Sequence, residues 1–192
     1  GKTIAHNQLG ANMVPGITAA LLRQSSMNGT LKADLGVLEV DEASLKGVAM
    51  EVPVQRVVVS NLFRDQLDRY GELDTTAKLI KEGIRQSFAP TEGKIILNSD
   101  DPLVAALPSE TDWNTLYFGV GQVEYLYPSN DKSIVPFPKE VTDCPQCGEN
   151  LDYGKRFFGH LGHYYCHSCQ FKRSQPTVEA TQVTVRPDSS EL

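Results

Sequence analysis

The sequence predicts an α/β domain with a mostly parallel sheet, joined to a small β-rich ribbon that binds a metal ion. Three observations lead to this prediction. Short apolar runs alternate with helical patterns in the first part of the chain, which is typical of βαβ units. Two Cys-x-x-Cys motifs near the end hold all four cysteines. Between these parts, the proline-bearing stretch 126–139 has the composition of a connector.

The expected strands are short runs of almost continuous apolar character. Such runs are typical of parallel strands that are buried on both faces. The expected strands cover residues 35–40, 56–61, 93–98 and 116–119, and a further one with alternating polarity covers 177–185.

A helix is expected over residues 73–87. Its apolar residues recur at spacings of four, three and four, which form one stripe on a helix, and charged residues fall mostly off that stripe. The stripe consists of Leu73, Ala77, Ile80 and Ile84. A second helix is expected after Gly16, over 17–22, followed by a loop over 25–30.

Composition narrows the class of protein. The 192 residues are 40% hydrophobic and 22% charged, as in soluble globular proteins. A net charge of −6 argues against general nucleic-acid binding, which requires a basic face. The longest apolar stretches, such as 56–60, are far shorter than the roughly 18 residues of a membrane span. No signal-peptide pattern is present, and we expect a cytoplasmic protein, in which paired cysteines favour metal over disulfides.

The cysteine motifs predict a structural zinc site. Cys144-Pro-Gln-Cys147 and Cys166-His-Ser-Cys169 are separated by eighteen residues, a spacing typical of a tetrahedral thiolate cage. Gly148 gives the first turn backbone freedom, and Tyr164 with Tyr165 suits a short hairpin. Four thiolates leave no open position, so the metal is expected to be structural.

Other interpretations of the ribbon remain open at this stage. The thiols could form two disulfides, stay free or act as a redox pair. Three histidines could compete as ligands, although a four-thiolate site needs none of them: His160, His163 and His167. We expect the metal to fold and brace residues 140–175, because metal binding and folding are coupled in small modules.

Polar clusters follow three of the expected strands. Open α/β sheets place ligands at this edge, and carboxylate and amide oxygens suit Mg²⁺ and phosphate chemistry. The clusters are Glu39-Val-Asp-Glu42, the stretch 60–71 and Asn98-Ser-Asp-Asp-Pro102. Taken singly, such acids can equally be helix caps or solvated turns, as Asp65 and Asp68 could be in the first turn of a helix.

Taken together, the motifs resemble the central ATPase domain of the Mur ligases, the ATP-dependent amide-forming enzymes of peptidoglycan synthesis. The resemblance covers nearly the whole chain. The matching segments are His6–Met13, Leu38–Glu42, Asn61–Gly71 and Leu97–Pro102. A four-cysteine ribbon inserted late in the central domain is a feature of the subtype that works with a glutaminase. The implied fold is a P-loop-NTPase-like α/β domain with that insertion.

The resemblance implies an activity and its cofactors. The subtype pairs with a GatD-type glutaminase and amidates the α-carboxyl of D-glutamate in lipid II, at the inner face of the membrane. The implied reaction uses ATP and Mg²⁺ to form an acyl phosphate, which ammonia from glutamine then attacks. Glu39 matches the glutamate that holds Mg²⁺, Asn61 lies where the motif approaches nucleotide and metal, and Asn98 with Asp101 matches a motif near the nucleotide.

Two departures from the family pattern bear on these roles. Gln66 stands where many Mur ligases have a histidine ligand, which puts a second metal site in doubt. Some members use a carbamylated lysine, but Lys78 and Lys81 are not assigned to that role. The resemblance implies that Arg64 and Asp65 order the loop. No catalytic residue is assigned.

The chain is expected to be a fragment. Gly1-Lys2-Thr3 resembles the end of a phosphate-binding loop, but no strand and glycine precede it, and the alignment by His6–Met13 places that loop before residue 1. The resemblance also implies a further domain that binds the glutaminase. Without the backbone amides and lysine of the phosphate-binding loop, the isolated chain is expected neither to bind ATP tightly nor to catalyse. The expected division is 1–139 for the central domain, 140–175 for the ribbon and 176–192 for a return strand.

Two other functions compete with this interpretation. The chain could be another Mur-like ligase, of the folylpolyglutamate type, although the ribbon and Gln66 count against it. It could also be a non-enzymatic ribbon module on an inert α/β scaffold. The ribbon would then be the working surface, with His160, Tyr164, Lys172 and Arg173 as its most important residues, and the strand-end acids would be inert.

Overall fold

The chain forms two compact units in the computed structural model. Unit 1 comprises Gly1–Gln55 and Asp68–Glu92, and unit 2 comprises Arg56–Leu67 and Gly93–Leu192. The described residues are 1–8, 10–62, 73–88, 93–109, 111–121, 141–182, 184–185 and 190–191. No helix among them is long and apolar enough to cross a membrane.

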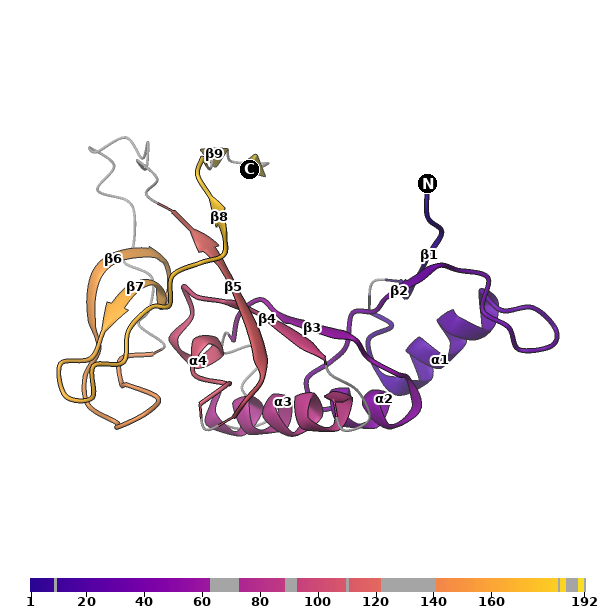
Figure 1. Cartoon of the computed structure of the whole chain (residues 1–192), viewed down its shortest axis with the longest axis horizontal. Helices are drawn as coiled ribbons and strands as arrows, with labels where there is room; N and C mark the ends of the chain where they lie inside the picture. The colour runs from indigo at the N-terminus through magenta and orange to yellow at the C-terminus, as the bar shows by residue number, and fades with distance from the viewer. Residues whose placement is uncertain are drawn as a thin grey trace. The chain divides into compact units, whose positions relative to one another are not determined.

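Unit 1 contains a small parallel sheet and three helices (Figure 1). Its elements are β1 (Ile4–His6), α1 (Val14–Arg23), β2 (Leu35–Val37), α2 (Leu45–Glu51) and α3 (Leu73–Phe88). Strand β1 runs parallel to β2, with Ile4 opposite Leu35 and His6 opposite Val37. The Gln24 side chain at the end of α1 donates a 3.0 Å hydrogen bond to the His6 carbonyl, which ties that helix to the sheet.

Helices α2 and α3 pack closely because a glycine leaves room for their contact. A Cβ at Gly83 of α3 would clash with the Leu45 side chain of α2. The apolar stripe expected on α3 is confirmed at its centre, where Ile80 and Ile84 are buried. An exposed ion pair of 3.0 Å between Lys46 and Glu82 adds little to the pairing.

Unit 2 is built on a four-stranded sheet in the order β3-β4-β5-β8, and all its strand pairs are parallel (Figure 1). The strands are β3 (Arg56–Val59), β4 (Lys94–Asn98), β5 (Asn114–Val120) and β8 (Val178–Ala180), with the short helix α4 (Pro102–Ala105) after β4. Ile95 and Leu97 of the central strand are fully buried. The predicted mostly parallel sheet is therefore confirmed.

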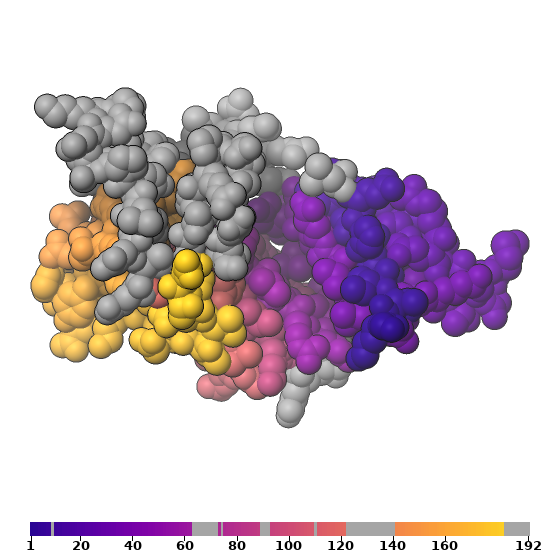
Figure 2. Space-filling model, turned by 90° about the horizontal axis from the view of Figure 1, so that it is seen from above, coloured from indigo at the N-terminus to yellow at the C-terminus, as the bar shows by residue number. Residues whose placement is uncertain are grey.

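The cysteine module forms an antiparallel hairpin of β6 (Asp152–Phe158) and β7 (Leu161–Tyr165). Gly162 lies so close to the Lys155 carbonyl that a side chain would not fit. In the view of Figure 2, the ribbon (orange to gold) and the segment after it (yellow) form one continuous surface. The β-rich ribbon expected from the cysteine spacing is present.

Some elements differ from the expectation. The strand expected over 177–185 is two strands, because β8 joins the parallel sheet whereas β9 (Thr184–Val185) pairs with β10 (Ser190–Glu191). Strand β2 stops at Val37, three residues earlier than predicted. The expected division at residues 139 and 140 lies outside the described residues and stays a prediction.

Candidate metal centre and strand-end site

The four cysteines converge on one point in unit 2. Their Sγ atoms all lie within 4.8 Å of one another, with 3.5 Å between Cys144 and Cys169 and between Cys147 and Cys166. These separations are too long for disulfides, which require about 2.05 Å. They are of the size that a tetrahedral thiolate site needs, so the cluster could hold one metal ion.

Two turns with the same hydrogen-bond pattern present the sulfurs. The amide of Cys144 donates to the Glu149 carbonyl at 2.7 Å, and the Gly148 amide returns to the Cys144 carbonyl at 2.8 Å. The second turn repeats this pattern: Cys166 donates to Phe171 at 2.7 Å, and Gln170 donates to Cys166 at 2.9 Å. Each turn offers one buried cysteine and one exposed cysteine.

Matching backbone conformations explain the shared pattern. Gly148 and Gln170 occupy the same place in their turns, and both are left-handed, with φ of 78° and 65°. Glycine adopts this conformation freely, whereas glutamine is strained in it.

The pKa values of the thiols differ because their surroundings differ. The amide of Cys169 lowers the pKa of the Cys166 thiol to about 7. At Cys147 the Glu149 amide acts to lower the pKa, but desolvation and the neighbouring thiols together raise it to about 12. Several adjacent thiolates repel one another, so holding all four requires a positive ion between them.

The ribbon histidines all have places outside this cluster, as the four-thiolate interpretation expects. His160 is fully buried, with Nε2 3.3 Å from an Asp101 oxygen. His167 is exposed and pairs with Asp152 at 2.7 Å. His163 lines a pocket described below.

The strand-end segment 98–101 is buried rather than open. Asn98 is 8% exposed, and Ser99, Asp100 and Asp101 are 0 to 2% exposed. The Asn98 Oδ1 accepts from the Asp100 amide at 2.9 Å, which closes a tight turn. Asn98 and Asp101, expected near the nucleotide, therefore lie on one compact turn at the carboxyl end of β4.

Asp101 binds three backbone amides. Oδ1 accepts from Leu103 at 2.9 Å and Val104 at 3.2 Å, which caps α4, and Oδ2 accepts from the Leu62 amide at 2.7 Å. Helix capping, one of the interpretations left open from the sequence, thus describes this carboxylate. The last bond also links Asp101 to the residue after Asn61, an exposed residue that follows β3.

The ribbon packs directly on the same turn. Tyr164 OH donates to the Ser99 carbonyl at 3.1 Å, and the Gly162 amide donates to the Asp100 carbonyl at 2.8 Å. Ribbon residues therefore contact the turn that binds the Leu62 amide, next to Asn61. This contact joins residues about 60 positions apart, so their spacing gave no signal for it.

A buried ion pair completes this contact. Arg173, which follows the second cysteine turn, donates from Nε to Asp100 Oδ1 at 2.6 Å and from Nη2 to the Val120 carbonyl at 2.8 Å. Burial raises the pKa of Asp100, although the Val120 amide and Arg173 act to lower it. The pair therefore joins the ribbon to both β4 and β5.

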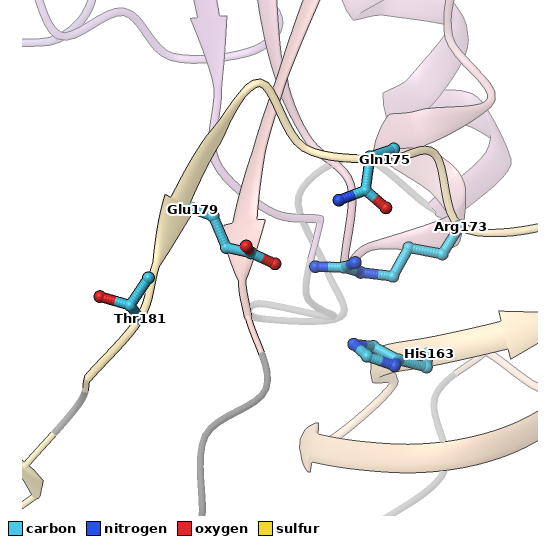
Figure 3. A pocket seen from close by; sticks show the side chains of 5 residues that line it. All are labelled: His163, Arg173, Gln175, Glu179 and Thr181. Carbon is cyan, nitrogen blue, oxygen red and sulfur yellow. The ribbon is translucent and has the colours of Figure 1, made fainter.

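A pocket of about 390 Å³ lies beside this ion pair (Figure 3). Figure 3 shows Arg173 and His163 on one side and Glu179 of β8 on the other. Burial lowers the pKa of His163, and the positive charge of Arg173 acts in the same direction.

These positions argue against the ribbon as an independent binding surface. Of the side chains that such a surface would use, His160 and Tyr164 are buried and Arg173 is paired with Asp100. Only Lys172 of that set is exposed.

In unit 1, the expected magnesium ligand Glu39 is exposed just after β2. Its backbone is held by Asn7, whose Oδ1 accepts from the Glu39 amide at 2.9 Å and whose Nδ2 donates to the Glu39 carbonyl at 2.8 Å. Nδ2 also donates to the Ala11 carbonyl at 2.9 Å. Asn7 lies in the segment His6–Met13, but the sequence does not indicate this role, because the contact spans 32 positions.

The remaining expected residues are placed as follows. Gly1-Lys2-Thr3 leads into strand β1, whereas a phosphate-binding loop leads into a helix. Lys78 is exposed on α3 and Lys81 is partly buried there. Arg64, Asp65, Gln66 and Asp68 lie outside the described residues.

Fold and site together define a Mur-ligase-like domain with a cysteine ribbon. The structure is similar to a pseudomurein peptide ligase type C from Methanothermus fervidus, with a TM-score of 0.66 and 26% identity. The match covers 100% of this chain and 36% of that chain. No family model matches the sequence.

More specifically, the chain is similar to the MurT subunit of lipid II isoglutaminyl synthase (glutamine-hydrolyzing). The subunit from Staphylococcus aureus (strain COL) is 36% identical over 184 residues, which cover 96% of this chain and 38% of the relative. The subunit from Streptococcus pneumoniae (strain ATCC BAA-255 / R6) is 35% identical over 180 residues, covering 92% and 37%. These relatives confirm the resemblance that the motifs indicate.

Proposed function

We propose that this chain is part of an ATP-dependent ligase that amidates the α-carboxyl of D-glutamate in the stem peptide of lipid II. The similarity to MurT subunits over 96% of the chain carries this proposal. The competing folylpolyglutamate-type ligase has no comparable support, and the inert-scaffold alternative conflicts with the buried positions of His160 and Tyr164.

The proposed reaction has two steps. The D-glutamate carboxylate attacks the γ-phosphorus of ATP, and ADP leaves as an acyl phosphate forms. Ammonia, released from glutamine by a GatD-type glutaminase, then attacks the acyl carbon, and the amide forms as phosphate and a proton leave. The chemistry belongs to the ligase and glutaminase together, acting on the cytoplasmic face of the membrane that carries lipid II.

Glu39 is the proposed Mg²⁺ ligand of this chain. Its exposed carboxylate follows a parallel strand, the usual ligand edge of an α/β sheet. The backbone of Glu39 is held at both its N–H and its C=O by Asn7, so the side chain starts from a defined position. Asn61 and Asn98 are proposed to lie near the nucleotide, and Asp101 to act by holding the backbone beside Asn61.

Zinc is the proposed occupant of the cysteine cluster. Four thiolates from two matching turns suit its preference for sulfur and tetrahedral geometry. Since no position stays open for substrate, the zinc is proposed to stabilise the ribbon and not to take part in the reaction.

The activity is proposed to require more than this chain. The chain spans 38% of the length of the S. aureus relative. We therefore expect the isolated chain to be inactive. Activity is to be assayed with the gene product that carries this chain.

The test is lipid II amidation by that gene product together with its glutaminase. Glu39→Gln is expected to abolish most of the activity, because a neutral amide binds Mg²⁺ more weakly than a carboxylate. Glu51→Gln, at the exposed end of α2, removes the same charge and is the matched control. Equal activity in both variants would contradict the role of Glu39, whereas absence of amidation by the unaltered pair would contradict the proposed function.

A further inference from the structure

The ribbon contacts three successive residues of the turn after β4. Tyr164 binds the Ser99 carbonyl, Gly162 and Arg173 bind Asp100, and His160 lies against the Asp101 carboxylate. A module that merely folded on its own would not need to engage each residue of this turn.

The contacting residues are close to the metal ligands in the chain. Tyr164 precedes Cys166 by two residues, and Arg173 follows Cys169 by four. Tyr164 is 3% exposed and stacks on Phe171, with ring centroids 5.4 Å apart, so its ring is held between the sheet and the cysteine turn. Because metal binding folds such modules, we expect the position of these side chains to depend on the metal.

The same turn is also hydrogen bonded to the end of the neighbouring strand β3. The same Asp101 oxygen, Oδ2, that lies 3.3 Å from His160 accepts the Leu62 amide at 2.7 Å. That amide belongs to the residue after Asn61, so one carboxylate oxygen joins the ribbon to the backbone at the end of β3. All of these groups are buried, where hydrogen bonds are strong and a lost partner is costly.

We propose that the zinc ribbon is a positioning element for the end of β3. His160 and Tyr164 hold the turn at Ser99–Asp101, and Asp101 holds the Leu62 amide and thereby the backbone of Asn61. The significance of Asn61 rests on the proposed function, but the mechanical link does not. His160 is thus a positioning residue, and it acts on Asn61 through Asp101.

Hydrogen exchange of the Leu62 amide in the zinc-loaded chain tests the link. His160→Leu keeps the bulk and removes the polar contact, and we expect Leu62 to exchange about fivefold faster or more, as expected for a weakened buried hydrogen bond. His160→Gln retains an N–H donor and is expected to restore slow exchange. His167→Leu, a change at an exposed histidine of the same ribbon, is the matched control.

A second pair of variants controls for effects of misfolding on the exchange of the Leu62 amide. Tyr164→Phe removes only the hydroxyl that binds Ser99, whereas Tyr165→Phe makes the same change at the next residue. Zinc content, measured on each variant, shows whether the ribbon is still loaded. Faster Leu62 exchange in Tyr164→Phe but not in Tyr165→Phe, with zinc retained in both, supports the proposal. Unchanged Leu62 exchange in both His160→Leu and Tyr164→Phe would overturn it.

Removal of zinc with a chelator is an independent test of the link between the ribbon and Leu62. We expect the amides of Gly148 and Leu62 to exchange faster together, while the Val48 amide of unit 1, which binds the Ser44 carbonyl, stays protected. Fast exchange at Gly148 with Leu62 still protected would overturn the proposal.

Activity distinguishes this inference from the proposed function. In the gene product with its glutaminase, His160→Leu is expected to raise the KM for ATP more than it lowers kcat, with recovery in His160→Gln. If the unaltered pair does not amidate lipid II, the proposed function fails while the exchange result stands. If amidation occurs but Leu62 exchange is insensitive to the ribbon, only the positioning role fails.

Discussion

At the scale of single residues, the role of a polar side chain follows from the backbone groups to which it is hydrogen bonded. Asp101 and Asn7 each bind three backbone groups, and each joins its own segment to a distant one: Asp101 to Leu62 and Asn7 to Glu39. A buried polar side chain of this kind is costly to remove, because its backbone partners lose their bonds but stay buried. The residue types in the motifs predicted that these polar side chains bind something. They could not show that Asp101 is buried and binds the protein backbone, whereas Glu39 is exposed to solvent.

Replacing Asn7 tests the clamp on Glu39. Asn7→Ala is expected to lower the free energy of unfolding by about 2 kcal/mol, since three hydrogen bonds of a buried amide are lost. Gln8→Ala, at an exposed amide one residue on, should change it by less than about 0.5 kcal/mol. Urea unfolding measures both values, and equal effects would contradict the clamp.

His163 predicts a pH dependence. Burial and Arg173 keep its pKa in the folded state below the ordinary value of 6.5. As pH falls below 6.5, the unfolded chain takes up a proton that the folded chain resists, so stability falls with pH in that range. His163→Gln should lose stability less steeply than the unaltered chain between pH 6.5 and 5, measured by thermal unfolding with zinc present. A steeper loss in the variant would contradict this sign.

At the scale of elements, sequence patterns predicted the parts that carry a continuous apolar signal. Strands β3, β4 and β5 and helix α3 were expected close to where they lie. Strand β1 is only three residues long, and α2 is seven residues long with Gly47 inside it, so neither has a recognisable period. Helix α2 depends instead on its packing against α3 at Gly83, a contact that local pattern does not reveal.

The two cysteine turns offer a paired test of backbone strain. Gln170→Gly should relieve the left-handed conformation and tighten zinc binding about fivefold, which is about 1 kcal/mol. Gly148→Ala should weaken it by a similar factor, and no atom lies near enough to clash with the added methyl. Competition with a chelator measures both. Effects of the same sign in the two variants would contradict the equivalence of the turns.

At the scale of the whole molecule, the chain is similar to Mur-type ligases, and its cysteine module packs against the strand ends of the unit 2 sheet. The cysteine spacing predicted the module and a zinc site in it, the four sulfurs do converge, and the comparisons confirm the kind of protein. What the spacing could not predict is where the ribbon packs, because His160 and Asp101 are 59 positions apart and meet only in the folded chain. The ribbon is therefore part of the strand-end region of unit 2.

The most direct test of the central claim follows the nitrogen atom. The gene product that carries this chain, with the proposed glutaminase, is incubated with lipid II, ATP and glutamine labelled with ¹⁵N in its side-chain amide. We predict that mass spectrometry finds the label in the α-carboxamide of D-glutamate, with one ATP consumed for each amide formed. Consumption of ATP without labelled lipid II, or a label on another carboxyl group, would contradict the account.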